Sequence, residues 1–185
     1  SEGWNLGPLP DGAVVWTGAL PPEWFTGYNP FMTRNISSEY TTFTSDWTTE
    51  EIHIFMRRRG MIFVDGRPLT QVFRSQGLGK TPGSFWVEDP GDRIHLRLWD
   101  DADPHHVPFE VTTREQAFAP REPGLGYIRV SGFTFEYAAD GIPVPQRAMV
   151  SASRGHHWII EDNDIRRANA CGVDVGNETW HRSGT

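Results

Sequence analysis

The sequence has very little cysteine, no long apolar run and almost no sustained 3.6-residue periodicity. Its single cysteine, Cys171, permits no internal disulfide and excludes a cysteine-rich zinc site. No apolar stretch reaches the roughly 18 residues that a membrane-spanning helix needs, so we expect no membrane partner. The first ten residues lack the basic start and apolar stretch of a signal peptide, although a chain that begins at Ser1 is compatible with a trimmed product.

Basic residues are scarcer than acidic ones, with 17 Lys and Arg against 24 Asp and Glu and a formal net charge of −7. A non-specific nucleic-acid binder needs a basic face to replace the counterions along the phosphates, so we expect no nucleic-acid partner. The one basic run is Arg57-Arg58-Arg59. Three residues are too few for a basic patch and are typical of a solvated strand end or turn.

Aromatic and turn-forming residues are abundant instead: 8 Trp, 19 Gly and 14 Pro. Such a composition favours many short strands with tight connections and predicts an all-β fold with very little helix. Residues 1–42, rich in Pro, Gly and aromatics, are expected to form a segment that wraps a surface, with one short strand at 13–17. Residues 43–118 predict a compact antiparallel β lobe, and residues 119–185 follow a different pattern.

Two hairpins define the predicted lobe. After a strand at 61–64, Asp65-Gly66 supplies the positive φ angles of a tight turn. The run SFWVEDPGDRIHLRLW then places two alternating strands around a turn, with Ile94, Leu96 and Leu98 on one face. A further strand is expected at 52–57.

The last third of the chain contains an internal repeat. YIRVSGFTFEYAADG is followed thirty residues later by HWIIEDNDIRRANACG, and three apolar positions superimpose: Ile128 with Trp158, Val130 with Ile160, and Phe135 with Ile165. Second short strands, at 148–153 and 172–176, lie about 23 residues apart, and GIPVPQR fits a loop insertion in the first turn. This period is typical of a parallel β-helix.

Asn163 lies where such a coil must bend, because asparagine satisfies backbone groups with its side chain and tolerates left-handed geometry. Spacing, corner residue and insertion all agree with coils of a right-handed parallel β-helix that carries an inserted antiparallel β lobe. The alternative is an antiparallel sandwich with coincidental spacing.

The order of these segments, from MIFVDGRPLTQV through SFWVEDPGDRIHLRL to the two repeats, resembles bacterial right-handed parallel β-helix proteins that act on carbohydrates. They include β-helix β-xylosidases and fucosidases, in which a small β domain interrupts the early coils. The resemblance covers about residues 60–178. It implies an extracellular or periplasmic carbohydrate-active protein whose partner is an oligo- or polysaccharide.

Members of that family are longer and usually carry their catalytic carboxylates on later coils. Two coils are fewer than the roughly three repeats that a solenoid needs to bury a stable core. We therefore expect the rest of the β-helix as a second chain or as a C-terminal region. The same coils also serve polysaccharide lyases and proteins without activity, so they specify architecture better than chemistry.

Strand alternation supplies candidate site residues. If Val173 and Val175 face the core, Asp174 faces outward, beside Ser151 of the preceding coil. Glycoside cleavage needs two carboxylates, one acid and one base or nucleophile, and benefits from an aromatic platform. Asp174 and Glu178 are the candidate catalytic pair, although both residue types are also common in solvated turns. The candidate sugar-binding residues are Ser151, His157, Trp180 and His181.

A metal or other cofactor is not assigned. The acidic residues around Asn163 could bind calcium through oxygen ligands, but an acidic run at a corner is more often simply exposed. Neighbouring histidines on an extended strand point to opposite faces, so neither His105-His106 nor His156-His157 forms a chelating site by itself. One histidine of each pair, such as His157, could still line a groove. The acidic residues are Glu161, Asp162 and Asp164.

Three functions agree with these patterns. The first is a glycoside hydrolase that cleaves by two-carboxylate chemistry in a groove along the coils. The second is a non-catalytic glycan-binding or structural module, in which exposed aromatics of the β lobe hold the glycan. The third is a polysaccharide lyase, which normally needs a basic residue and often calcium near uronic acids; Arg154 or Arg182 alone is too little to assign it.

Overall fold

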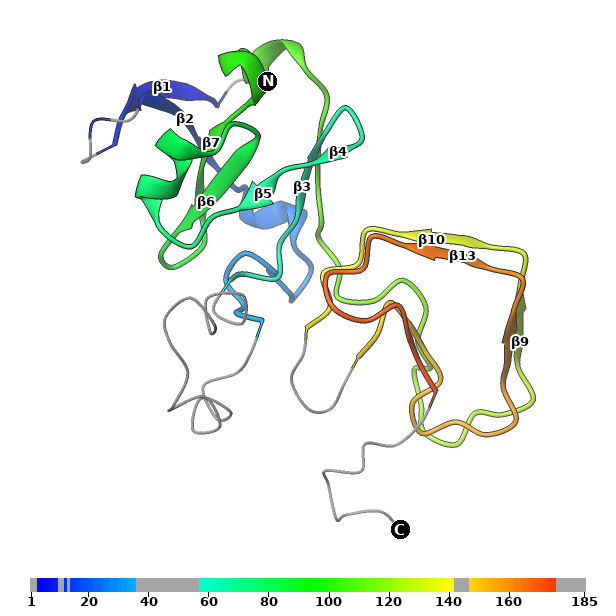
Figure 1. Cartoon of the computed structure of the whole chain (residues 1–185). Helices are drawn as coiled ribbons and strands as arrows, with labels where there is room; N and C mark the ends of the chain where they lie inside the picture. The colour runs from blue at the N-terminus through cyan, green and yellow to red at the C-terminus, as the bar shows by residue number, and fades with distance from the viewer. Residues whose placement is uncertain (1–2, 10–11, 13, 36–56, 142–146, 176–185) are drawn as a thin grey trace, which may run out of the picture.

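The computed structural model in Figure 1 describes residues 3–9, 12, 14–35, 57–141 and 147–175. These residues form strands joined by turns and short 3-10 helices, without an α-helix among them, which confirms the predicted all-β class. No helix in the described ranges is long and apolar enough to cross a membrane. The 3-10 helices are η1 (Pro22–Trp24), η3 (Ser75–Lys80), η4 (Trp99–Asp101) and η5 (Pro104–His106).

A five-stranded sheet forms most of the lobe, in the order β1-β2-β7-β6-β5. Its pairs are antiparallel except for β5 and β6, which are parallel. The strands are β1 (Asn5–Pro8), β2 (Val14–Ala19), β5 (Thr70–Gln71), β6 (Ser84–Glu88) and β7 (Arg93–Arg97). The structure differs here from the sequence analysis, because the strands at 5–19 extend the sheet of the lobe rather than wrapping a surface.

A second sheet, in the order β4-β3-β8, packs beside the first. Its strands are β3 (Ile62–Val64), β4 (Arg67–Pro68) and β8 (Phe109–Val111). Asp65 and Gly66 adopt φ angles of 50° and 70°, as predicted for the turn between β3 and β4. The faces of both sheets meet in one core that includes Ile62, Val64, Phe85, Ile94, Leu96 and Leu98.

The chain after residue 126 winds twice around a roughly rectangular path (Figure 1) and pairs with itself in parallel. The pairs are β9 (Arg129–Ser131) with β12 (Ile159–Glu161), β10 (Thr134–Glu136) with β13 (Asp164–Arg166), and β11 (Val150–Ser151) with β14 (Val173–Asp174). Val130 lies beside Ile160 and Phe135 beside Ile165, as predicted from the repeat. Val150 lies beside Val173, which confirms the shorter period that the sequence predicts for the pair of β11 with β14.

The corners of the two windings repeat with the same thirty-residue spacing. Residues at each corner have left-handed φ angles: Tyr127 57° and His157 55°, Gly132 79° and Asp162 52°, Tyr137 65° and Arg167 61°. A left-handed residue bends an extended chain sharply within one position. Three such corners per winding separate the short strands.

Asn163 is a corner residue, as predicted, but Asp162 takes the left-handed conformation. The Asn163 side chain bonds to the winding below it: its Oδ1 accepts from the backbone N–H of Phe133 at 3.0 Å, and its Nδ2 donates to the carbonyl of Val130 at 2.8 Å. It therefore joins two windings at the point where the strand ladder is interrupted.

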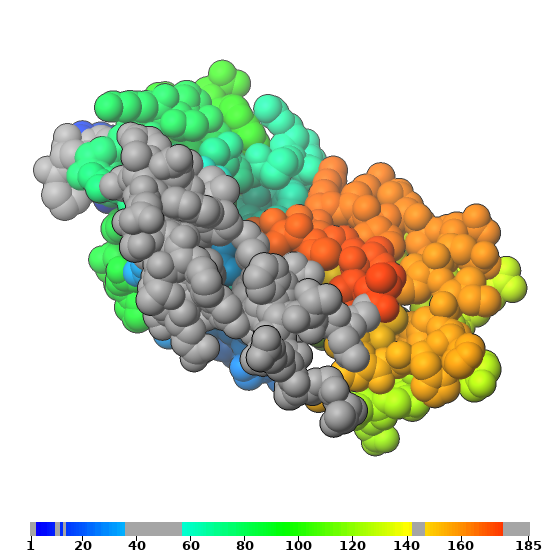
Figure 2. Space-filling model, turned by 60° about the horizontal axis from the view of Figure 1, so that its bottom comes forward, coloured from blue at the N-terminus to red at the C-terminus, as the bar shows by residue number. Residues whose placement is uncertain are grey.

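Polar contacts hold the lobe against the windings, which lie side by side in Figure 2. The Tyr28 hydroxyl donates to the carbonyl of Ala139 at 2.6 Å. Arg59 donates through Nη1 to Glu115 at 3.0 Å, and Arg147 donates to the same carboxylate at 3.1 Å. Arg59 is only 6% exposed. The expectation of a solvated turn at Arg57-Arg58-Arg59 is therefore wrong, because its last arginine is a buried ion-pair partner.

Candidate functional site

Asp174 and Ser151 lie beside each other on β14 and β11, as the sequence predicts, but both are buried, at 8% and 1% exposure. Asp174 Oδ2 accepts from the backbone N–H of Ala148 at 3.0 Å, and Ser151 Oγ accepts from the N–H of Ser153 at 3.2 Å. Val175, expected in the core, is 82% exposed. The predicted outward orientation of Asp174 is thus wrong, since β14 ends after two residues and alternation does not continue through Val175.

The second carboxylate oxygen of Asp174, Oδ1, is the atom at this site that can make a further interaction. Oδ1 is buried and has no hydrogen-bond partner among the residues that the structure describes. A buried polar atom without a partner costs free energy, so it is a candidate for a further contact. Glu178, Trp180 and His181 lie outside the described residues, and the catalytic pair of Asp174 and Glu178 stays a prediction.

His157 occupies a corner rather than a strand. Its ring stacks on that of Tyr127, with centroids 4.7 Å apart and planes inclined by 15°. The Nδ1 atoms of His156 and His157 are 2.9 Å apart. The expectation that these histidines point to opposite faces is wrong, because the left-handed corner at His157 turns both rings to one side. His157 lines a cavity of about 380 Å³ together with Trp158, and its role as a sugar contact stays a prediction.

The acidic residues around Asn163 do not converge on one point. Glu161 is paired with Arg129 of the preceding winding, and Asp164 lies 3.4 Å from Arg166. Within the described ranges, no three side chains of His, Cys, Asp or Glu are grouped so that they could hold a metal ion. The arrangement of these acids fits ion pairs along the outer surface of the windings.

A larger cavity, of about 630 Å³, lies at the junction between the lobe and the windings. The apolar part of its wall includes Phe63, Leu69 and Phe85 of the lobe. The windings contribute Arg167 and Asn169. Cavities at such junctions, apolar with a few polar groups, are typical ligand sites.

Arg167 is held at the edge of this cavity by its surroundings. Its guanidinium donates to the hydroxyl of Tyr137, lies 3.5 Å from Glu136, and is 5.8 Å from the ring centroid of Phe63. The rings of Phe63 and Tyr137 meet edge to face at 4.4 Å. This site is not visible in the sequence because residues such as Phe63 and Arg167 are about a hundred positions apart, and only folding brings them together.

Buried ionisable groups surround the same junction. Asp140 is fully buried and accepts from the backbone N–H groups of Ala170 at 3.1 Å and Cys171 at 2.5 Å. Burial raises the pKa of Asp140, and these N–H donors oppose the rise. Burial also raises the pKa of Tyr28 to about 12, although the nearby Arg59 lowers it in part. Asp140 thus joins the two windings to each other, and Tyr28 joins the windings to the lobe through the carbonyl of Ala139.

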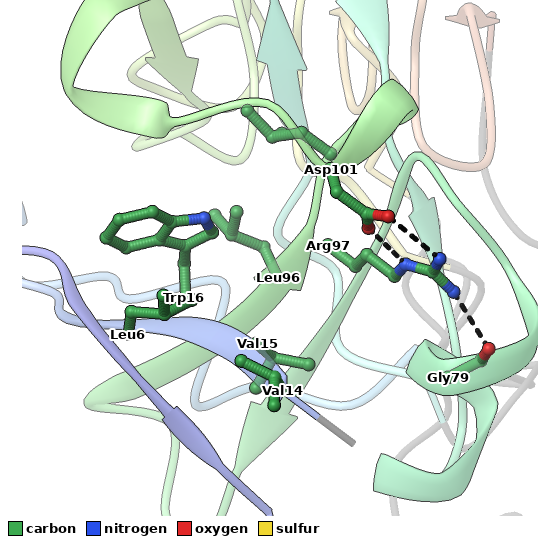
Figure 3. Close-up of a pocket in the computed structure, with 9 residues that line it drawn as sticks. Leu6, Val14, Val15, Trp16, Gly79, Leu96, Arg97 and Asp101 are labelled. Carbon is green, nitrogen blue, oxygen red and sulfur yellow. Dashed lines mark hydrogen bonds and ion pairs between the residues drawn. The ribbon is translucent and has the colours of Figure 1, made fainter.

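A separate hollow of about 390 Å³ lies on the lobe at β1, β2 and β7 (Figure 3). Its floor is apolar and includes Leu6, Val14 and the half-buried ring of Trp16. At its edge Arg97 donates to both carboxylate oxygens of Asp101, at 2.6 and 3.3 Å, and to the carbonyl of Gly79 at 2.8 Å. The hollow thus offers a flat aromatic surface next to a fixed polar rim.

Comparison with known proteins gives one informative likeness. No family model matches the sequence, and no curated protein sequence matches it. A solved structure described as "The complex structure of XylC with xylose" matches with a TM-score of 0.70 and 21% sequence identity. The match covers 97% of this chain and 30% of the XylC chain, so the likeness concerns the fold of less than a third of that protein.

Proposed function

We propose that this chain is part of a carbohydrate-active protein, most simply a glycoside hydrolase, whose two windings are coils of a right-handed parallel β-helix. The rest of the helix, as a further region or a second chain, would stack on these coils. An oligo- or polysaccharide is the proposed substrate. Such proteins act on extracellular polymers, so the proposed location is extracellular or periplasmic.

The observation that carries this proposal is the parallel register of the windings. Three parallel strand pairs, with apolar residues of one winding beside apolar residues of the next, are what a β-helix requires. The fold likeness to XylC, which was solved with xylose, supports a sugar as ligand. Architecture alone does not define chemistry, so the activity must be argued from the sites.

The junction cavity is a proposed sugar-binding subsite, separate from Asp174, which does not line it. Its apolar lining includes Met61 and Pro68, which are partly exposed and would contact a sugar ring. The guanidinium of Arg167, which also lines it, would bond to sugar hydroxyls. A cavity of about 630 Å³ is within the usual range for small-ligand sites.

The proposed reaction is acid/base cleavage of a glycosidic bond by two carboxylates. Asp174 and Glu178 are the proposed pair, with Trp180 as the platform and His181, His157 and Ser151 as sugar contacts. The buried Oδ1 of Asp174 is the atom that would take part, because Oδ2 already binds Ala148. Calcium is not part of the proposal.

An activity screen on aryl glycosides tests the proposal, with the chain alone and with its longer natural product. Asp174→Asn is the critical variant, because the amide oxygen can still accept from Ala148 while the carboxylate is removed. We expect its activity to fall by about two orders of magnitude or more, the usual loss for an acid/base group. Unchanged activity of Asp174→Asn in a folded protein would exclude Asp174 as a catalytic residue.

The lobe hollow favours a second function, a non-catalytic glycan-binding module. Trp16 provides an aromatic surface there, and the Arg97–Asp101 ion pair provides polar groups at its rim. Trp16→Ala would then weaken binding of neutral oligosaccharides about tenfold, the order of a lost stacking contact. Trp24→Ala is the matched control, because Trp24 is 49% exposed and does not line the hollow. Isothermal titration with xylotriose separates the two variants.

A further inference from the structure

Two neighbouring histidines of the second winding, His156 and His157, hold their rings close together on its surface. Their Nδ1 atoms are 2.9 Å apart, and the ring planes are almost perpendicular, at 88°. Both residues are exposed, and both line the cavity of about 380 Å³ beside Trp158. Imidazole is the commonest metal ligand in proteins, so two such nitrogens lie together where dissolved ions can reach them.

The first winding fixes the orientation of both rings. The His156 ring lies directly over Gly126, its neighbour in the parallel ladder, where a Cβ atom would overlap the ring. The Tyr127 ring stacks on that of His157, with planes inclined by 15°, and meets that of His156 edge to face at 5.3 Å. Because packing already holds the rings, little side-chain freedom is lost when both bind one ligand.

The separation of the two nitrogens matches that of a metal chelate. Imidazole nitrogens bind a zinc-sized ion at about 2.0–2.1 Å, so two of them lie about 2.9 Å apart at an N–metal–N angle of about 90°, and about 3.3 Å apart at the tetrahedral angle. Right angles are typical of square-planar or tetragonal Cu²⁺ and Ni²⁺ sites, and Cu²⁺ binds such ligands most tightly of the divalent first-row ions. The observed 2.9 Å therefore favours Cu²⁺ over tetrahedral Zn²⁺.

The same two nitrogens form a hydrogen bond in the metal-free protein. One Nδ1 carries a hydrogen and donates it to the other. A metal ion takes the place of this hydrogen, which moves through solvent to Nε2 of the same ring, so that both histidines stay neutral and both Nδ1 lone pairs bind the ion. Each Nε2–H then points away from the ion and can donate to a sugar hydroxyl, so the proposed sugar contact of His157 is compatible with a bound metal.

We propose that His156 and His157 chelate one divalent transition-metal ion, Cu²⁺ in preference, through their Nδ1 atoms. Within the described ranges no third histidine, cysteine or carboxylate is grouped with them, which leaves the other coordination positions to water. The neighbouring pair His105-His106 lacks this geometry, because Nδ1 of His105 bonds to Asp103 at 2.7 Å. The site rests on the two rings and their packing, and it stands without the proposed carbohydrate function.

Isothermal titration of the full chain with Cu²⁺ and with Zn²⁺, in a buffer that does not bind metals, tests the site. We expect Cu²⁺ to bind at least about tenfold more tightly than Zn²⁺. His156→Ala and His157→Ala should each weaken Cu²⁺ binding at least about tenfold, because the second imidazole binds an ion that the first already holds, at high effective concentration. His106→Ala is the matched control: its side chain is 82% exposed and lies outside this cavity, so its loss should leave the affinity nearly unchanged.

Electron paramagnetic resonance of the Cu²⁺ complex reports the nitrogen ligands independently of affinity, and circular dichroism shows that each variant keeps its fold. We expect two imidazole nitrogens in the natural chain and one in each of His156→Ala and His157→Ala. A single nitrogen in the natural chain would overturn the chelate. Equal losses of affinity in His156→Ala and His106→Ala would overturn the site in favour of scattered surface histidines. Zn²⁺ binding as tight as that of Cu²⁺ would overturn the right-angle geometry and the preference for Cu²⁺.

Discussion

Asn163 offers a direct test of how the two windings are joined. Its side chain makes two hydrogen bonds to the preceding winding, one to the N–H of Phe133 and one to the carbonyl of Val130. Each such bond contributes about 0.5–1.5 kcal/mol net. Asn163→Ala should therefore lower the free energy of unfolding by about 1–3 kcal/mol, with the lower part of that range favoured because Phe133 is 54% exposed and its N–H can be hydrated.

Urea denaturation followed by circular dichroism measures this loss, as a lower midpoint at an unchanged slope. Asn163→Asp separates the two bonds, because it keeps the acceptor for Phe133 but replaces the donor to Val130 with an oxygen. We expect it to be no more stable than Asn163→Ala. A loss below about 0.5 kcal/mol in Asn163→Ala would refute the role of Asn163 as the link between windings.

Three further predictions concern the junction and β14. Glu115→Gln should destabilise the protein by about 2 kcal/mol, because it removes the partner of the buried Arg59; the same substitution at the half-exposed Glu88 is the control, and denaturant midpoints report both. Burial raises the pKa of Tyr28 to about 12, so the folded protein favours the protonated hydroxyl; the contribution of Tyr28 to stability is fully present below pH 10 and is lost as pH rises toward 12. The fall in the free energy of unfolding between pH 9 and pH 11 should therefore be smaller in Tyr28→Phe than in the natural chain. Asp174→Ala should be about 1–2 kcal/mol less stable than Asp174→Asn, since only asparagine can still accept from Ala148; equal midpoints would contradict the structural role of Asp174.

The sequence predicts the strand pairing of the windings well because the pairing is periodic. Val130 with Ile160 and Phe135 with Ile165 follow from a thirty-residue offset, and the second offset, of about 23 residues, places Ser151 beside Asp174. The hairpin at Asp65-Gly66 follows from local turn chemistry. In each case the information lies within one repeat or one turn.

Features that depend on distant partners were not predictable in the same way. The pairing of β2 with β7 joins segments about eighty residues apart that carry no matching pattern, so residues 1–42 read as a wrapping segment. The burial of Asp174 depends on its contact with Ala148. The orientation of His157 depends on its left-handed φ angle, which a histidine does not predict. The alternation of side chains holds only in an extended strand. The predictions for Asp174 and His157 are wrong because these residues lie at the end of a strand and between two strands.

The basic run at 57–59 also shows which features a sequence predicts and which depend on distant partners. The basic run at 57–59 was visible in the sequence, but its neighbours in space were not. Arg59 pairs with Glu115 across the junction, while Arg57 and Arg58 join Arg34 and Arg74 around one groove. Whether a short charged run is solvated or buried is decided by tertiary packing, which three consecutive residues cannot encode.

The change in period between strand pairs has an evolutionary consequence. The first winding uses seven more residues than the second between the corner at Tyr137 or Arg167 and the next parallel strand, yet the pairs on either side of that difference stay in register. This side of the winding can therefore gain or lose residues without disturbing the stacking of its neighbours. A lineage could therefore lengthen the chain on this side, while the remaining corners, each tied to the neighbouring winding, keep a fixed length.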